Sequence, residues 1–204
     1  RHSREALEDD LGLSLERPTA LVTLHPPTNS LDTLDSLLNE FQRALVLAQE
    51  EFGLQYIFTA PNADPGAGKI ETALKRFSSE RSDCIFVPSL GPTRYISLMH
   101  YVSIMIGNSS SAFHEAPLAQ LPAVNIGDRQ KGRLAGDNVV SVSITAEAIL
   151  DGIRKGMTMP KKQNFECPYG TGSASPIIRS FIKKVFQQHG RTEILKKKFS
   201  DLVC

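Results

Sequence analysis

Short runs of β-branched and aliphatic residues alternate with helical patterns along most of the chain. The first run, residues 19–25 (TALVTLH), is apolar nearly throughout, which is typical of a parallel strand buried on both faces. Behind it, apolar residues repeat at helical spacing: Leu31, Leu34, Leu37, Leu38, Phe41, Leu45 and Ala48. We expect Thr28, Asn29 or Ser30 to cap this helix.

The same strand and helix pattern recurs further along the chain. Expected strands span residues 54–61, 84–89, 102–110, 123–127 and 138–142, and expected helices span 68–77, 93–100, 112–119 and 145–156. Strands separated by helices pair in parallel through right-handed crossovers, so the sequence predicts an α/β fold with a doubly wound, Rossmann-like parallel sheet. In such sheets ligands bind outside the carboxyl ends of the strands. The loops to consider therefore follow His25, Ala60, Pro88, Gly107 and Gly127.

The domain organisation follows from a change in composition. Residues 1–158 are expected to form the Rossmann-like domain, and residues 159–175, rich in Pro, Gly, Ser and Lys without periodicity, an extended connector. Residues 176–204 are expected to form a C-terminal helix and tail, with Gly190 ending the helix. Its apolar stripe comprises Ile177, Ile178, Phe181, Ile182, Val185 and Phe186. The chain does not begin with methionine, so we expect it to be a piece of a longer protein.

Composition excludes several classes of function. The 23 Lys and Arg residues balance 22 Asp and Glu residues, which argues against a nucleic acid or an anionic membrane as partner. Three scattered cysteines, Cys84, Cys167 and Cys204, argue against a disulfide framework or a zinc site and favour a reducing cytoplasm. No run approaches the roughly 20 apolar residues of a membrane span. The basic segment at residues 191–199 is expected to be the solvated face of a terminal helix.

Three consecutive serines, residues 109–111, follow the expected strand that ends at Gly107-Asn108. A strand that ends in this way and opens a helix presents free backbone N–H groups and hydroxyls, which suit a phosphate. The alternative is that Asn108 or Ser109 only caps the helix. Glu115 is expected about one and a half helical turns further on, where its carboxylate suits the two hydroxyls of a ribose. Alternatively, Glu115 is a solvated residue near the helix start.

Cations follow the next strand. Arg129, Lys131 and Arg133 are expected at the same rim, and Arg129, nearest the strand end, is the candidate for a bidentate phosphate contact. His25 ends the first strand, where it is either a catalytic group or a residue packed beside the core. Asn62 and Asp64 lie in a glycine-rich turn without the spacing of a P-loop, and they either touch a ligand or form an Asx turn.

Four segments together resemble the C-terminal half of the UDP-N-acetylglucosamine 2-epimerase family. They are TLHPPTN at residues 23–29, PNADPGAG at 61–68, GNSSSAFHEAPLAQLPAVNIGDRQKGR at 107–133 and PYGTGSAS at 168–175. The long third segment is more similar to the hydrolysing branch, which releases UDP and an N-acetylmannosamine-type sugar. The non-hydrolysing branch usually has Asp-Ser-Gly-Gly in place of the serine loop and His-Arg at the histidine motif. The resemblance extends from about Arg4 to Ile182.

The resemblance implies one half of a glycosyltransferase-B-type architecture. In that architecture two Rossmann-like domains face each other across the nucleotide sugar, and the C-terminal helix crosses back to the other domain. The N-terminal domain, which supplies other acidic catalytic groups, is absent from this chain. The partners implied are therefore a UDP-sugar, that N-terminal domain and, as an alternative partner, a second copy of the chain. Neither a cofactor nor a metal ion is implied.

The resemblance also implies a role for each site residue. Ser109 and Ser110 would hold the diphosphate and Glu115 the ribose. The backbone around Val87 to Gly91, which includes Leu90, would cradle the uracil, with Asn62 as a further contact. His25 and Arg129 would be the catalytic residues facing the diphosphate and the sugar. The reaction implied is removal of the C2 proton, anti elimination of UDP and hydration with inversion at C2. A UDP-sugar glycosyltransferase and a non-catalytic UDP-binding or regulatory module are the alternatives.

Overall fold

The fold is described from a computed structural model, which defines residues 1–27, 33–159, 164–170, 172, 174–189, 191–194 and 196. The chain divides into two compact units, Arg1–Pro168 and Tyr169–Cys204, and each is described by itself.

The first unit is built on a six-stranded sheet with the order β3-β2-β1-β4-β5-β6. The strands are β1 Thr19–Thr23, β2 Gln55–Thr59, β3 Cys84–Val87, β4 Ile104–Gly107, β5 Ala123–Ile126 and β6 Val139–Val142. All pairings are parallel, which confirms the predicted doubly wound sheet. Strands β2 and β3 are added on one side of β1, and strands β4, β5 and β6 on the other. The strand order therefore reverses between β1 and β4, and ligands of such sheets bind at this switch point.

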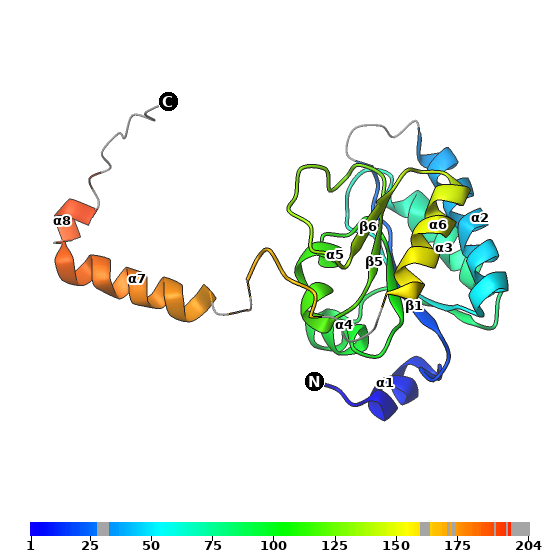
Figure 1. Cartoon of the computed structure of the whole chain (residues 1–204), viewed down its shortest axis with the longest axis horizontal. Helices are drawn as coiled ribbons and strands as arrows, with labels where there is room; N and C mark the ends of the chain where they lie inside the picture. Colours follow the sequence, from blue (N-terminus) through cyan, green and yellow to red (C-terminus); the bar gives the residue numbers. More distant parts are fainter. Residues whose placement is uncertain are drawn as a thin grey trace. The chain divides into compact units, whose positions relative to one another are not determined.

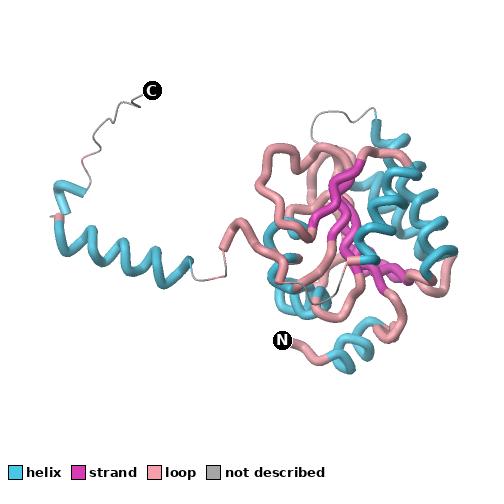
Figure 2. Tube along the Cα trace, viewed as in Figure 1, coloured by secondary structure: helices cyan, strands magenta, loops and turns pink. Residues whose placement is uncertain are grey.

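Helices cover both faces of the sheet, and Figures 1 and 2 show the strands between two helical layers. One layer contains α2 Leu34–Phe52, α3 Ala67–Ser79 and α6 Ala146–Thr158. The other contains α1 Arg4–Leu11, α4 Gly91–Met99, α5 Ser111–His114 and the 3₁₀ helix η2 Pro117–Ala119. Alternate β1 residues enter the two cores, Val22 the first and Leu21 the second. Burial on both faces explains why this strand is apolar nearly throughout.

Helix α2 follows the apolar repeat predicted for it. Its stripe from Leu34 to Ala48 is buried, and Gly53 ends the helix in the left-handed conformation, with its N–H donated to the carbonyl of Gln49. The capping residues expected for this helix, and Leu31, lie outside the described residues. Thr33 occupies the N-cap position, where its side chain makes no capping hydrogen bond.

Two local predictions were incomplete or wrong. Helix α1 was not predicted, although Ser3 caps it by accepting the N–H of Ala6 and Gly12 ends it. The single helix expected over residues 112–119 is wrong, because the structure contains the one-turn α5 followed by η2. Pro117 has no N–H to donate, so the α-helical hydrogen bonds cannot continue through it. Glu115 is consequently the residue after α5 and not a residue within a longer helix.

The first unit extends to Pro168, past the expected boundary at residue 158. Phe165 is buried, and its N–H donates to Oε1 of Gln120 at 2.8 Å. Cys167 contacts the carbonyl oxygen of His114 at 3.7 Å. Residues 164–168, which were assigned to the connector, therefore pack on the first unit.

The second unit contains α7 Ala174–Gln188 and α8 Arg191–Ile194. Helix α7 is amphipathic in sequence, yet none of its residues is buried. Its exposed large apolar side chains are Ile177, Ile178, Phe181, Ile182 and Phe186. Gly190 and Cys204 lie outside the described residues, and the crossing of this helix to another domain stays a prediction.

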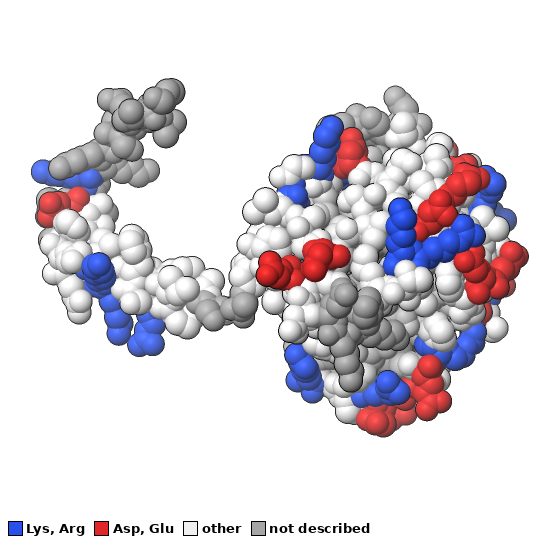
Figure 3. Space-filling view, viewed as in Figure 1, with Lys and Arg blue, Asp and Glu red and all other residues white. Residues whose placement is uncertain are grey.

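Charged side chains of both signs alternate over the face of the first unit seen in Figure 3. Several form ion pairs between helices, such as Arg154 with Glu51 at 2.7 Å and Arg43 with Glu147 at 2.9 Å. Within the described ranges, no helix combines the length and the apolar character required to cross a membrane. Those ranges also contain no group of three or more His, Cys, Asp and Glu side chains placed to hold a metal ion.

Candidate functional site

The carboxyl ends of β1 and β4 meet at a glycine. Gly107 has φ of 145°, and a Cβ atom at this position would lie 1.9 Å from the carbonyl oxygen of Thr23. Only glycine permits this approach, which also lets the N–H of Asn108 donate to the Thr23 carbonyl at 3.2 Å. Gly107 therefore brings the serine loop against the end of β1.

Asn108 holds the backbone of His25 through two hydrogen bonds. Its Oδ1 accepts the His25 N–H at 2.7 Å, and its Nδ2 donates to the His25 carbonyl at 2.9 Å. Asn108 is 3% exposed, and Gln130 donates from Nε2 to its carbonyl oxygen at 2.8 Å. A buried chain of hydrogen bonds thus connects the loops after β1, β4 and β5.

The ring of His25 is oriented by the loop after β2. The N–H of Asn62 donates to Nδ1 of His25 at 3.0 Å, which leaves the proton of the neutral ring on Nε2. Burial lowers the pKa of His25, the Arg129 guanidinium lowers it further, and Asp64 acts in the opposite direction. His25 is therefore favoured as a neutral imidazole that donates from Nε2.

Arg129 lies at the same rim and pairs with Asp64. Its Nη2 is 3.5 Å from Oδ2 of Asp64, and its side chain is only 19% exposed. Asp64 also accepts a hydrogen bond from Nδ2 of Asn62. Among the described residues, Nε of Arg129 and Oδ1 of Asn62 are buried without a hydrogen-bond partner. The structure thus groups four predicted residues, His25, Asn62, Asp64 and Arg129.

The serine loop offers backbone N–H groups beside this group. Ser109 is buried, and its Oγ accepts the N–H of Ser111 at 3.3 Å. Among the described residues, the N–H groups of Ser109 and Ser110 donate no hydrogen bond within the chain. Because α5 has only four residues, its dipole adds little, and these N–H groups and the hydroxyls of Ser109 and Ser110 are donors that can serve an anion.

A cleft of about 400 Å³ lies beside the strand ends. It is lined by Thr59, Ala60, Pro88, Ser89, Leu90, Gly91, Pro92, Tyr95, Ile96 and Glu115. The predicted uracil contact Leu90 and the predicted ribose contact Glu115 therefore line the same cleft. Thr23 lies behind it, with its hydroxyl 2.7 Å from that of Thr59 and 3.2 Å from that of Tyr95. Burial raises the pKa of Tyr95, so its hydroxyl stays protonated.

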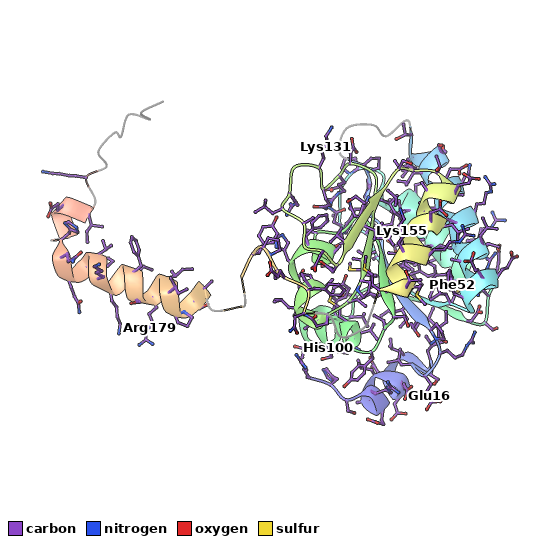
Figure 4. All side chains as sticks on the ribbon, in the orientation of Figure 1. Glu16, Phe52, His100, Lys131, Lys155 and Arg179 are labelled. Carbon is purple, nitrogen blue, oxygen red and sulfur yellow. The ribbon has the colours of Figure 1, made fainter. Side chains whose placement is uncertain are left out.

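The remaining cations of the segment differ from Arg129. Lys131 and Arg133 are exposed, and Nη1 of Arg133 lies 3.1 Å from Nε2 of His114. Figure 4 shows Lys131 near the carboxyl ends of the strands and His100 near their amino ends. Of the three predicted cations, only Arg129 joins the His25 group.

Sequence reasoning missed three residues of the site. Asn108 was considered only as a helix cap, whereas Gln130 and Tyr95 were not considered as site residues. The signal for both Asn108 and Gln130 was their position in the loops after the strand ends: Asn108 follows β4 directly, and Gln130 lies in the loop after β5. A larger groove of about 970 Å³ lies between α2 and α3, but none of the predicted site residues lines it.

The chain is similar in sequence to known proteins. A profile of the family described as UDP-N-acetylglucosamine 2-epimerase matches residues 1–183. The chain is 30% identical over 183 residues to a Legionella pneumophila protein named UDP-N,N'-diacetylbacillosamine 2-epimerase (hydrolyzing), covering 90% of the chain and 47% of that protein. It is 30% identical over 201 residues to the Campylobacter jejuni GDP/UDP-N,N'-diacetylbacillosamine 2-epimerase (hydrolyzing), covering 98% of the chain and 51% of that protein.

Solved structures share the fold. The Methanocaldococcus jannaschii UDP-GlcNAc 2-epimerase in complex with UDP-GlcNAc and UDP superposes with a TM-score of 0.65 at 15% identity, covering 90% of the chain and 49% of that structure. The Escherichia coli ADP-heptose heptosyltransferase II gives a TM-score of 0.57 at 14% identity, covering 77% of the chain and 52% of that structure. The chain thus spans about half the length of these proteins, which confirms the predicted half of a glycosyltransferase-B-type fold.

Proposed function

The chain belongs to the UDP-N-acetylglucosamine 2-epimerase family, and we propose that it is the UDP-sugar-binding, C-terminal half of a hydrolysing member. The assignment to the hydrolysing branch is supported by the names of the two relatives that are 30% identical to the chain. The substrate class proposed is a UDP-linked 2-acetamido sugar. The products are UDP and the free sugar inverted at C2.

The observation that carries this proposal is the convergence of Leu90 and Glu115 on one cleft beside the serine loop. The apolar wall at Leu90 and the backbone of Gly91 suit the flat uracil ring. Each oxygen of the Glu115 carboxylate can accept a proton from one ribose hydroxyl. The cleft therefore orients a nucleoside with its phosphates toward the strand ends.

The diphosphate would lie at the serine loop. The N–H groups of Ser109 and Ser110 are available there, and Arg129 supplies a fixed positive charge from the loop after β5. Elimination makes UDP the leaving group, so negative charge grows on the diphosphate as the bond to C1 breaks. Preorganised N–H donors and a guanidinium stabilise that charge, which is their proposed catalytic contribution.

His25 would act at the junction of diphosphate and sugar. Its neutral ring donates from Nε2, so it can give a hydrogen bond to the departing phosphate oxygen and stabilise the charge that grows there. The base that removes the C2 proton is proposed to lie on the other half of the protein. Turnover therefore requires both halves, whereas UDP binding requires mainly this one.

Calorimetry with UDP tests the proposed site on the chain itself. Weak binding is expected for the wild type, and Glu115→Ala and Arg129→Ala should abolish it. Glu50→Ala, which removes an exposed carboxylate of α2, is the matched control and should bind like the wild type. Equal binding by all four proteins would refute the site.

Turnover by the protein with both halves separates the alternatives. A hydrolysing epimerase converts its UDP-sugar in water alone, whereas a glycosyltransferase of the same architecture requires an acceptor. Release of UDP and of a C2-inverted sugar without an acceptor is the expected result. UDP binding without turnover under either condition would favour the regulatory module.

A further inference from the structure

Arg129 is held in place within the chain before any phosphate group reaches it. Its side chain is 19% exposed, and one edge of the guanidinium is occupied by Oδ2 of Asp64 at 3.5 Å. Its Nε is buried and has no hydrogen-bond partner among the described residues. Among those residues, the carboxylate of Asp64 is therefore the acceptor that the guanidinium contacts. A phosphate oxygen that takes the same guanidinium edge must compete with Asp64.

Asp64 is better placed to move than Arg129. Its side chain is 45% exposed, and it lies in the loop between β2 and α3. Its carboxylate also accepts a hydrogen bond from Nδ2 of Asn62, so it retains a partner after leaving the arginine. Water can solvate the released carboxylate, whereas the buried guanidinium needs an anion beside it.

We propose that Asp64 is an internal competitor for Arg129, which a diphosphate must displace, and that it thereby limits how tightly the chain binds phosphate-bearing ligands. The inference rests on the proposed function, because it takes UDP as the ligand. Asp64 is a specificity-determining residue in this scheme: it opposes anions that cannot outcompete one carboxylate. A diphosphate, which carries more negative charge than a carboxylate and can accept two parallel hydrogen bonds, is able to do so.

Asp64→Asn tests the proposal with little change in shape. The asparagine oxygen can still accept from Asn62, but the negative charge beside Arg129 is gone. Calorimetry at fixed ionic strength should show UDP binding tightened by roughly fivefold, the upper range for an exposed ion pair. Uridine, which lacks phosphates and is proposed to occupy only the Leu90–Glu115 cleft, should bind the variant and the wild type equally.

Asp128→Asn is the matched control, because Asp128 is an exposed carboxylate next to Arg129 in sequence. It should change UDP affinity by less than about twofold, as expected for a screened surface charge. UDP affinity that is equal or weaker in Asp64→Asn, or a gain for uridine as large as that for UDP, would overturn the proposal and leave the UDP site intact. Failure of the wild type and of Asp64→Asn to bind UDP at all would overturn both proposals.

Discussion

Asn108→Asp is the substitution that most directly tests the hydrogen-bonded frame of the site. The two side chains have nearly the same shape, so packing is preserved and only the hydrogen-bonding character changes. One carboxylate oxygen can still accept the N–H of His25 as Oδ1 does at 2.7 Å. The other replaces the amide nitrogen that donates to the His25 carbonyl at 2.9 Å, so two acceptors then face each other.

The expected cost follows from burial. Asn108 is 3% exposed, so water cannot relieve the facing oxygens. Losing the partner of a buried acceptor costs about 1–3 kcal/mol, and the uncompensated charge adds to this. We expect the free energy of unfolding to fall by about 3 kcal/mol at neutral pH.

The cost should depend on pH in a defined direction. When the carboxyl group introduced by Asn108→Asp is protonated, it can donate to the His25 carbonyl as the amide does. Folding therefore raises the pKa of this carboxyl above the ordinary aspartate value of about 3.9. The variant approaches wild-type stability at acidic pH and loses that stability as the pH rises through the raised pKa.

Urea unfolding followed by far-UV circular dichroism, from about pH 5 to about pH 8, measures the difference in unfolding free energy between variant and wild type. Asn39→Asp places the same charge at an exposed position of α2 and should stay within about 0.5 kcal/mol of wild type. A difference below about 1 kcal/mol at neutral pH, or one that does not shrink on acidification, would refute the reasoning.

Three further predictions concern the sheet, His25 and α7. Gly107→Ala should destabilise the fold by more than about 3 kcal/mol in urea unfolding, because its Cβ meets the Thr23 carbonyl at 1.9 Å, whereas Gly68→Ala, with open space around it, should change stability by about 1 kcal/mol or less. Burial lowers the pKa of His25, so as the pH drops the unfolded chain protonates this histidine before the folded chain does. The free energy of unfolding of the wild type should therefore decrease below the ordinary pKa of 6.5. His25→Gln should show a smaller decrease, and an equal decrease in both proteins would contradict this. The exposed stripe of α7 should cause self-association in light scattering that Phe181→Ser reduces, while a monomeric wild type at all concentrations would contradict it.

The layered fold could be predicted from the sequence because its signals are local. A strand buried on both faces, such as β1, is apolar nearly throughout, and α2 repeats its buried residues at helical spacing. Their alternation leaves few topologies, and the observed strand order is one of them. The polar residues that follow the strands could likewise be placed at the carboxyl ends of the sheet. This reasoning predicted that His25 and Arg129 lie close together.

The contacts within the site could not be predicted in the same way. Asn108 is a plausible helix cap when only its neighbours are considered, but the chain uses its amide on His25, far away in sequence. The tautomer of His25 depends on one backbone N–H of Asn62, which no pattern of side chains encodes. The ion pair of Arg129 with Asp64 depends on how two loops meet, and loop conformation follows from the assembled sheet.

The central position of β1 also has a consequence for how the chain folds as it is synthesised. The strands β1, β2 and β3 are neighbours in the sheet and leave the ribosome before β4. Until β4 pairs with it, β1 is an apolar edge with unpaired backbone groups, a form that readily associates with other chains. The backbone of His25 also lacks its hydrogen bonds to Asn108, which lies 83 positions further along the chain, until that residue has been synthesised. Closing that long-range contact is expected to be slow, so the proposed nucleotide site should mature late in the folding of the unit.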